Sequence, residues 1–97
     1  MKRTASMVYR ETIESRELHL YGVNNDKVYS HFKAVAKNLR KKIDKGTYDS
    51  DKAVDAFYHV ANTASAEYNR EFGYGFSAQD RFTCACDLRD DFEGEVF

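Results

Sequence analysis

The chain has 97 residues, which is enough for one domain and too few for two. Apolar residues make up 42% and charged residues 32%, a balance too hydrophobic for a disordered chain and too charged for a membrane protein. The formal net charge of −1 argues against a protein that coats nucleic acid uniformly. We therefore expect one soluble, cytoplasmic domain spanning residues 1–97, with no membrane partner, because no secretory signal or bilayer-length apolar run is present.

The N-terminal region shows little helical periodicity. Residues 1–16 mix charged and polar side chains, and we expect them to be mobile. In residues 17–23, Leu18 and Leu20 alternate with His19 and Tyr21, a period of two that predicts a short strand or extended segment.

Two long helices are predicted next. Asn24, Asn25 and Asp26 supply capping side chains for a helix that continues to about Lys45 and ends before Gly46. Its apolar stripe has steps of three and four residues: Val28, Phe32, Val35, Ala36, Leu39 and Ile43. A second helix is expected from about Ser50 to Phe72, before Gly73. Its inward stripe is Val54, Phe57, Ala61, Ala64, Tyr68 and Phe72.

A third helix begins after the capping sequence at Ser77 and is expected to reach about Asp91, followed by a fraying tail over 93–97. Its inward residues are predicted to be Phe82, Ala85, Leu88 and Phe92. The sequence thus predicts a mainly α fold: a three-helix bundle with a short N-terminal extended or strand segment.

Charge is segregated along the chain. Residues 27–45 hold seven basic side chains and one acid, and four of the bases fall on one helical face: Lys33, Lys37, Arg40 and Lys41. This basic face is either a solvated helix surface or a binding site for an acidic protein or a nucleic acid. Residues 80–97 hold six acids and two bases. The two poles could pair within one molecule or between copies, so a homo-oligomer stays open.

No catalytic or metal-binding pattern is present. Cys84 and Cys86 point in different directions on a helix, so we interpret them as small apolar residues rather than as a metal or redox pair. His19, His31 and His59 share no ligand spacing, and the residues Gly73–Gly75 lack the other parts of a phosphate loop. We expect no enzyme activity, no cofactor and no metal.

One stretch resembles a recurring group of small phage-encoded helical proteins. It covers about residues 18–73 and includes Glu71-Phe72-Gly73, and its most specific segment is Lys45-Gly46-Thr47-Tyr48-Asp49. The resemblance implies a viral origin and an accessory role in an infected bacterial cytoplasm, and it assigns no site residue. The leading hypothesis is a non-enzymatic phage accessory protein that binds a host or viral macromolecule. The alternatives are a nucleic-acid-binding module that uses the basic face and an oligomer that sequesters small anionic ligands.

Overall fold

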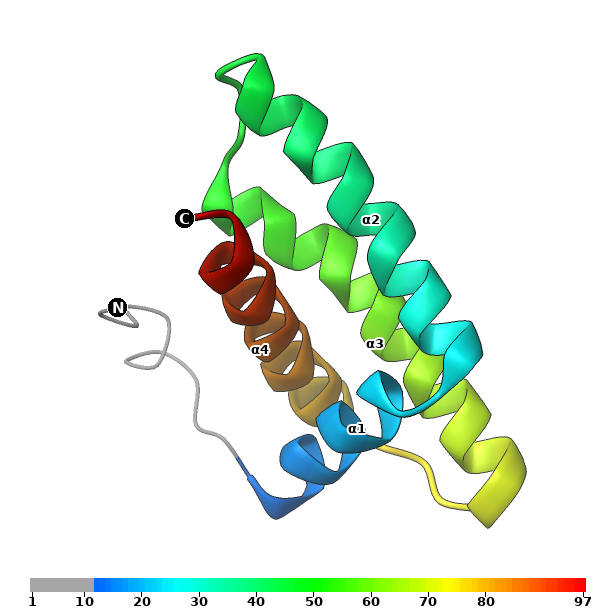
Figure 1. Cartoon of the computed structure of the whole chain (residues 1–97). Coiled ribbons are helices and arrows are strands. Elements are labelled where there is room, and N and C mark those ends of the chain that lie inside the picture. The colour runs from blue at the N-terminus through cyan, green and yellow to red at the C-terminus, as the bar shows by residue number, and fades with distance from the viewer. Residues whose placement is uncertain (1–11) are drawn as a thin grey trace.

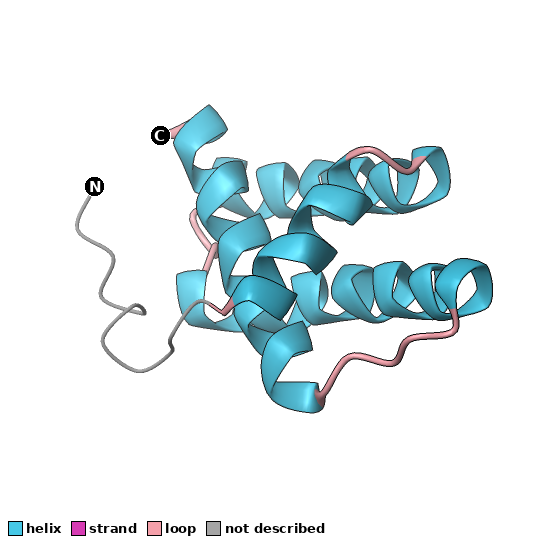
Figure 2. Cartoon of the chain, turned by 90° about the horizontal axis from the view of Figure 1, so that it is seen from below, coloured by secondary structure: helices cyan, strands magenta, loops and turns pink. Residues whose placement is uncertain are grey.

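The computed structural model describes residues 12–97, which form four helices and no strand. They are α1 (Ile13–Val23), α2 (Asp26–Asp44), α3 (Ser50–Phe72) and α4 (Ala78–Val96). Helices α2 and α3 run antiparallel beside each other, α4 packs along α3, and the short α1 lies across one end of the bundle (Figure 1). Figure 2 shows helices joined by short loops throughout this part of the chain. The mainly α prediction is confirmed.

The predicted strand over 17–23 is wrong, because these residues belong to α1. The side chain of Thr12 accepts from the backbone N–H of Ser15, and the side chain of Ser15 accepts from the backbone N–H of Thr12, so a capping box starts the helix. The buried residues of α1 are Ser15, Leu18 and Gly22, at helical steps of three and four. Two of these three residues are not apolar, so the hydrophobic pattern did not reveal the helix, and the bundle has four helices instead of three.

Of residues 1–16, for which the sequence predicts mobility, residues 1–11 lie outside the described part of the chain. Thr12 onward belongs to the cap and first turn of α1. The other helix ends show the local chemistry that is typical of helix caps. Asn25, Asp49 and Ser77 accept backbone N–H groups at the starts of α2, α3 and α4. Gly46 and Gly73 adopt φ of 74° and 72°, the left-handed region in which glycine carries no steric penalty.

The core is built from aromatic and small side chains. The ring of Phe57 lies 5.3 Å from that of Phe32 and 5.8 Å from that of Phe92, which links α3 to both α2 and α4. Gly22 of α1 allows close approach to α3, because a Cβ at this position would lie 3.6 Å from the Cβ of Ala64. Most residues of the predicted apolar stripes face this core, and among them Phe57 and Phe92 are fully buried.

Two aromatic residues predicted to face inward are exposed instead. Phe72 is 61% exposed and Phe82 is 38% exposed. Residues 83–89 are all buried on α4, a helix that contacts both α1 and α3, so a single apolar stripe does not describe it. Phe72 lies in the last turn of α3, immediately before the chain leaves the bundle at Gly73.

The fraying tail is also wrong, because α4 continues to Val96. The hydroxyl of Tyr48 donates to the Glu93 carboxylate at 2.7 Å, and the Ser50 hydroxyl contacts the same carboxylate oxygen at 2.5 Å. The Tyr48 ring lies 5.9 Å from that of Phe97. These contacts with the loop before α3 and its first residue hold the last turn of α4 in place.

Candidate binding surface

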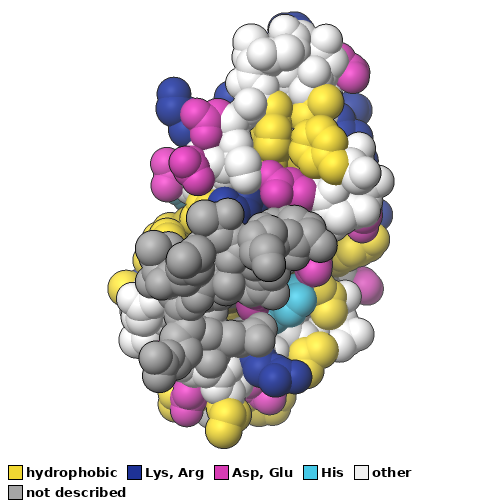
Figure 3. Space-filling view, turned by 90° about the vertical axis from the view of Figure 1, so that its left-hand side faces the viewer, with side chains coloured by type: hydrophobic (Ala, Val, Ile, Leu, Met, Phe, Trp, Pro, Cys, Tyr) yellow, Lys and Arg dark blue, Asp and Glu magenta, His cyan; other side chains and the backbone are white. Residues whose placement is uncertain are grey.

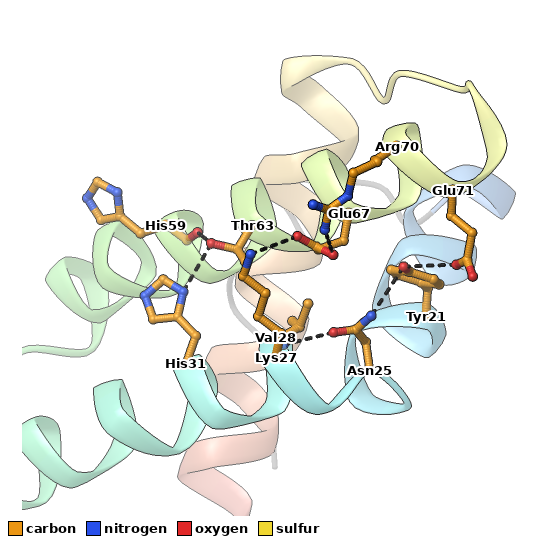
Figure 4. Close-up of polar contacts among 10 residues, drawn as sticks. All are labelled: Tyr21, Asn25, Lys27, Val28, His31, His59, Thr63, Glu67, Arg70 and Glu71. Carbon is orange, nitrogen blue, oxygen red and sulfur yellow. Dashed lines mark hydrogen bonds and ion pairs between the residues drawn. The ribbon is translucent and has the colours of Figure 1, made fainter.

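Helices α2 and α3 meet along a seam that is polar over its first half (Figure 4). The Lys27 ammonium lies 3.0 Å from the Glu67 carboxylate, which also pairs with Arg70. One turn further along α2, Nδ1 of His31 lies 3.1 Å from the Thr63 hydroxyl oxygen. The hydrogen bond from Lys27, with that from Arg70, lowers the pKa of Glu67. These side chains close the seam near the N-terminus of α2.

The second half of the seam is open. Beyond His31 a hollow of about 460 Å³ lies between the helices, with Val35, Leu39 and Ala56 as its apolar lining. A neighbouring hollow of about 250 Å³ shares Leu39 and Ala56 and extends to the start of α3. We call the two together the α2/α3 groove. Its lysines come from both helices: Lys41, Lys42, Lys45 and Lys52.

The groove carries a positive charge over an apolar floor. All four lysines are exposed, and none forms an ion pair with another of the residues that the structure describes. The acid in the lining, Asp49, is exposed as well, and its carboxylate accepts two backbone N–H groups at the start of α3. An apolar hollow with convergent cationic side chains can hold an anionic ligand that also has apolar surface.

The predicted basic face is divided by the tertiary structure. Lys33, Lys37, Arg40 and Lys41 are all exposed on α2, but only Lys41 lines the groove. Lys33 lies over the Tyr29 ring at 4.9 Å. Arg40 turns toward α4, where it lies 5.9 Å from the Phe92 ring and 3.5 Å from the Glu95 carboxylate. Of the two kinds of pairing left open between the basic and acidic segments, the structure contains one within the molecule, between Arg40 and Glu95.

No family model, curated protein or solved structure matches this chain. The assignment of the site therefore depends on the geometry of the groove and on the chemistry of its side chains.

Sequence reasoning missed Lys42, Lys45 and Lys52 as site residues. Lys42 and Lys45 are among the seven bases of residues 27–45 but lie outside the predicted basic face. The available signal was a stripe along α2 that begins with Lys27 and His31 and continues with Asn38, Lys42 and Lys45 at helical spacing. Lys52 belongs to another helix, and only the packing of α3 against α2 brings it to the groove.

The acidic C-terminal segment is less of a surface pole than its composition predicted. Asp87 is 4% exposed, and Asp90 pairs with the buried Arg89 at 3.4 Å. Figure 3 shows one side of the molecule, on which acidic side chains lie among apolar and basic ones outside the grey area, without a continuous cationic patch. Residues 80–97 therefore contribute to the interior as well as to the surface.

Three further features are absent from residues 12–97: a metal-binding cluster, a disulfide and a membrane-spanning helix. No group of three or more His, Cys, Asp or Glu side chains within residues 12–97 is arranged to hold a metal ion. Cys84 and Cys86 are buried and form no disulfide, and burial raises the pKa of the Cys84 thiol, which keeps it protonated. No helix in this range is both long enough and apolar enough to cross a membrane.

Proposed function

We propose that this protein is a non-enzymatic binding factor whose α2/α3 groove takes up an acidic, partly apolar segment of a partner protein. The resemblance to small phage-encoded proteins supports an accessory role, with a host or viral protein as the partner. The observation that carries the proposal is the combination of an apolar floor with lysines from two helices that have no ion-pair partner among residues 12–97.

The apolar floor favours a protein segment over a nucleic acid backbone. Burying apolar surface contributes roughly 25 cal/mol per Å², and a partner side chain that covers Val35 and Leu39 gains this contribution. A phosphate backbone offers charge but little apolar surface for the same floor. Four lysines then attract acidic residues on either side of the buried side chain, which increases the association rate and fixes orientation.

A nucleic-acid-binding module is the second candidate, and a different observation favours it. Lys33, Lys37 and Lys41 are exposed at successive turns of α2, and none forms an ion pair with a described residue. Such a row can contact successive phosphates, with an affinity that falls steeply as salt concentration rises.

Two variants with the same change in charge separate these candidates. The groove variant carries Lys42→Glu and Lys45→Glu, and the face variant carries Lys33→Glu and Lys37→Glu. All four positions are exposed, so both variants are expected to keep the wild-type melting temperature within a few degrees. Each protein is used to capture partners from a host lysate, with and without nuclease.

For the proposed function, the groove variant loses a partner protein that the wild type and the face variant retain, and nuclease has no effect. For the nucleic-acid module, the face variant loses duplex or single-stranded nucleic acid in a salt-dependent gel shift, and the groove variant is less affected. If the wild type and both variants capture the partner equally well, the partner does not bind in the groove and the proposal is wrong. A sequesterer of small anions is distinguished by titration with nucleotides, which the groove variant would no longer bind.

A further inference from the structure

Five aromatic side chains cluster where α1 and α3 end and the loop to α4 begins. Tyr68 is central: its ring centroid lies between 4.7 and 6.3 Å from those of its four neighbours. We call this group the aromatic corner, and it consists of Tyr21, Tyr68, Phe72, Tyr74 and Phe76. Phe76 is buried and anchors the cluster, whereas Phe72 is 61% exposed and Tyr74 is 46% exposed. The corner therefore presents apolar surface that the described residues do not cover.

Acidic side chains border this apolar surface. The Tyr21 hydroxyl donates to Glu71 at 3.1 Å, and the Tyr68 hydroxyl donates to Glu17 at 3.4 Å. Neither carboxylate forms an ion pair with a cation among residues 12–97. Glu67 differs, because Lys27 and Arg70 both pair with it. The exposed ring of Phe72 thus stands beside a carboxylate, Glu71, that no described cation neutralises through an ion pair.

The corner and the α2/α3 groove both expose apolar surface, and they carry opposite charges. The corner offers an exposed phenyl ring next to an anion, and the groove offers an apolar hollow edged by lysines that form no ion pair within residues 12–97. They cannot meet within one molecule, since Ala56 in the groove and Phe72 in the corner are sixteen residues apart on one continuous helix, or roughly 24 Å. A second copy of the chain brings its corner to the groove without any change of fold.

We infer that the aromatic corner of one molecule docks in the α2/α3 groove of a second copy. Phe72 packs on Val35, Leu39 and Ala56, and Glu71 faces Lys42 and Lys45. The two surfaces differ, so the contact is heterologous and repeats from copy to copy as a chain or a closed ring. The inference builds on the proposed function in one respect: the second copy occupies the same groove as the partner and therefore competes with it.

The test is complementation between two defective variants. The corner variant carries Phe72→Ala and Glu71→Gln and keeps an intact groove. The groove variant, Lys42→Glu with Lys45→Glu, keeps an intact corner. Neutral changes at the corner avoid creating a new charge pair between the two variants. The exposed residue Ile13, changed to Ala, controls for the loss of an exposed apolar side chain.

Sedimentation equilibrium over a concentration series gives the readout. We expect the wild type and the Ile13→Ala control to associate, more weakly at high salt. Each variant alone should associate at least about tenfold more weakly. An equimolar mixture of the two variants should recover association and stop at a dimer, because it supplies one intact groove and one intact corner.

Several results would overturn the inference. One is a wild type that stays monomeric throughout the series, and another is a mixture that associates no better than either variant alone. If the wild type stays monomeric and captures a basic partner protein that the corner variant does not capture, the corner binds a foreign cationic partner instead of a second copy. If the wild type does not self-associate but captures a partner through the groove, this inference is rejected and the proposed function is retained. Self-docking without groove-dependent capture rejects the proposed function and keeps this inference.

Discussion

Nδ1 of His31 lies 3.1 Å from the hydroxyl oxygen of Thr63, and this contact ends the polar half of the α2/α3 seam. The Thr63 hydroxyl donates its single hydrogen to the backbone carbonyl of His59 at 3.1 Å. It can therefore only accept from His31, which assigns the proton of the neutral imidazole to Nδ1.

Replacement of Thr63 by Val is expected to remove this acceptor with little change in shape. The free energy of unfolding should fall by about 1 kcal/mol, the usual net contribution of one hydrogen bond. Urea denaturation measures the loss, and nitrogen NMR of the imidazole should show that the preference for the Nδ1–H tautomer disappears in the variant. A tautomer population equal to that of the wild type would contradict the assignment.

The Glu67 carboxylate gives the seam a dependence on pH. Its pKa is lowered from the ordinary value of 4.5 by hydrogen bonds from Lys27 and Arg70, so its contribution to stability is complete above that value. The contribution is lost as the pH falls through the lowered pKa, because the unfolded chain then binds the proton more readily. A Glu67→Gln variant should have a shallower acid limb in a plot of unfolding free energy against pH. Asp26→Asn, at an exposed acid in the first turn of α2, is the control. If the Glu67→Gln variant has an acid limb as steep as that of the wild type, the ion pairs of Glu67 do not stabilise the fold.

The two helical glycines Gly22 and Gly94 should respond in opposite directions to added side-chain atoms. A Cβ at Gly22 would lie 3.3 Å from Cγ1 of Val28, so Gly22→Val overpacks the junction of α1 with α2 and should cost about 1–3 kcal/mol. Apart from its chain neighbours and the backbone of its own helix, no described atom lies within 4 Å of the same position at Gly94, where Ala should stabilise the helix by about 0.5 kcal/mol. Thermal melting of the two variants checks both signs. A Gly22→Val protein as stable as the wild type would show that α1 does not pack this closely.

The contact between Tyr48 and Glu93 should stabilise the end of α4. Burial, with the nearby Glu93 carboxylate, raises the pKa of Tyr48, so its hydroxyl remains a donor well into the alkaline range. Tyr48→Phe removes that donor at 2.7 Å and should lower the free energy of unfolding by about 1 kcal/mol.

Hydrogen exchange at residues 93–96 should become faster in this variant, since the last turn loses a contact to the segment before α3. Tyr29→Phe is a matched control, because Tyr29 is exposed and its ring stacking on Phe32 does not need the hydroxyl. Equal exchange rates in both variants would exclude a role for the Tyr48 hydroxyl.

Local chemistry alone determined α2, α3 and the start of α4. The capping oxygens of Asn25, Asp49 and Ser77 and the left-handed glycines Gly46 and Gly73 act within one turn of the chain, so their effect can be read from neighbouring residues. The apolar steps of three and four likewise identified the buried faces of α2 and most of α3.

The tertiary structure decided the rest. Helix α1 is buried through Ser15 and Gly22, and the small size of these residues matters only because other helices come close to them. The groove combines Lys42 of α2 with Lys52 of α3, and Arg40 leaves the predicted basic face for Glu95 of α4. A pattern along one helix gives the direction of each side chain but not which helix lies opposite, so positions shared between helices follow only from their packing.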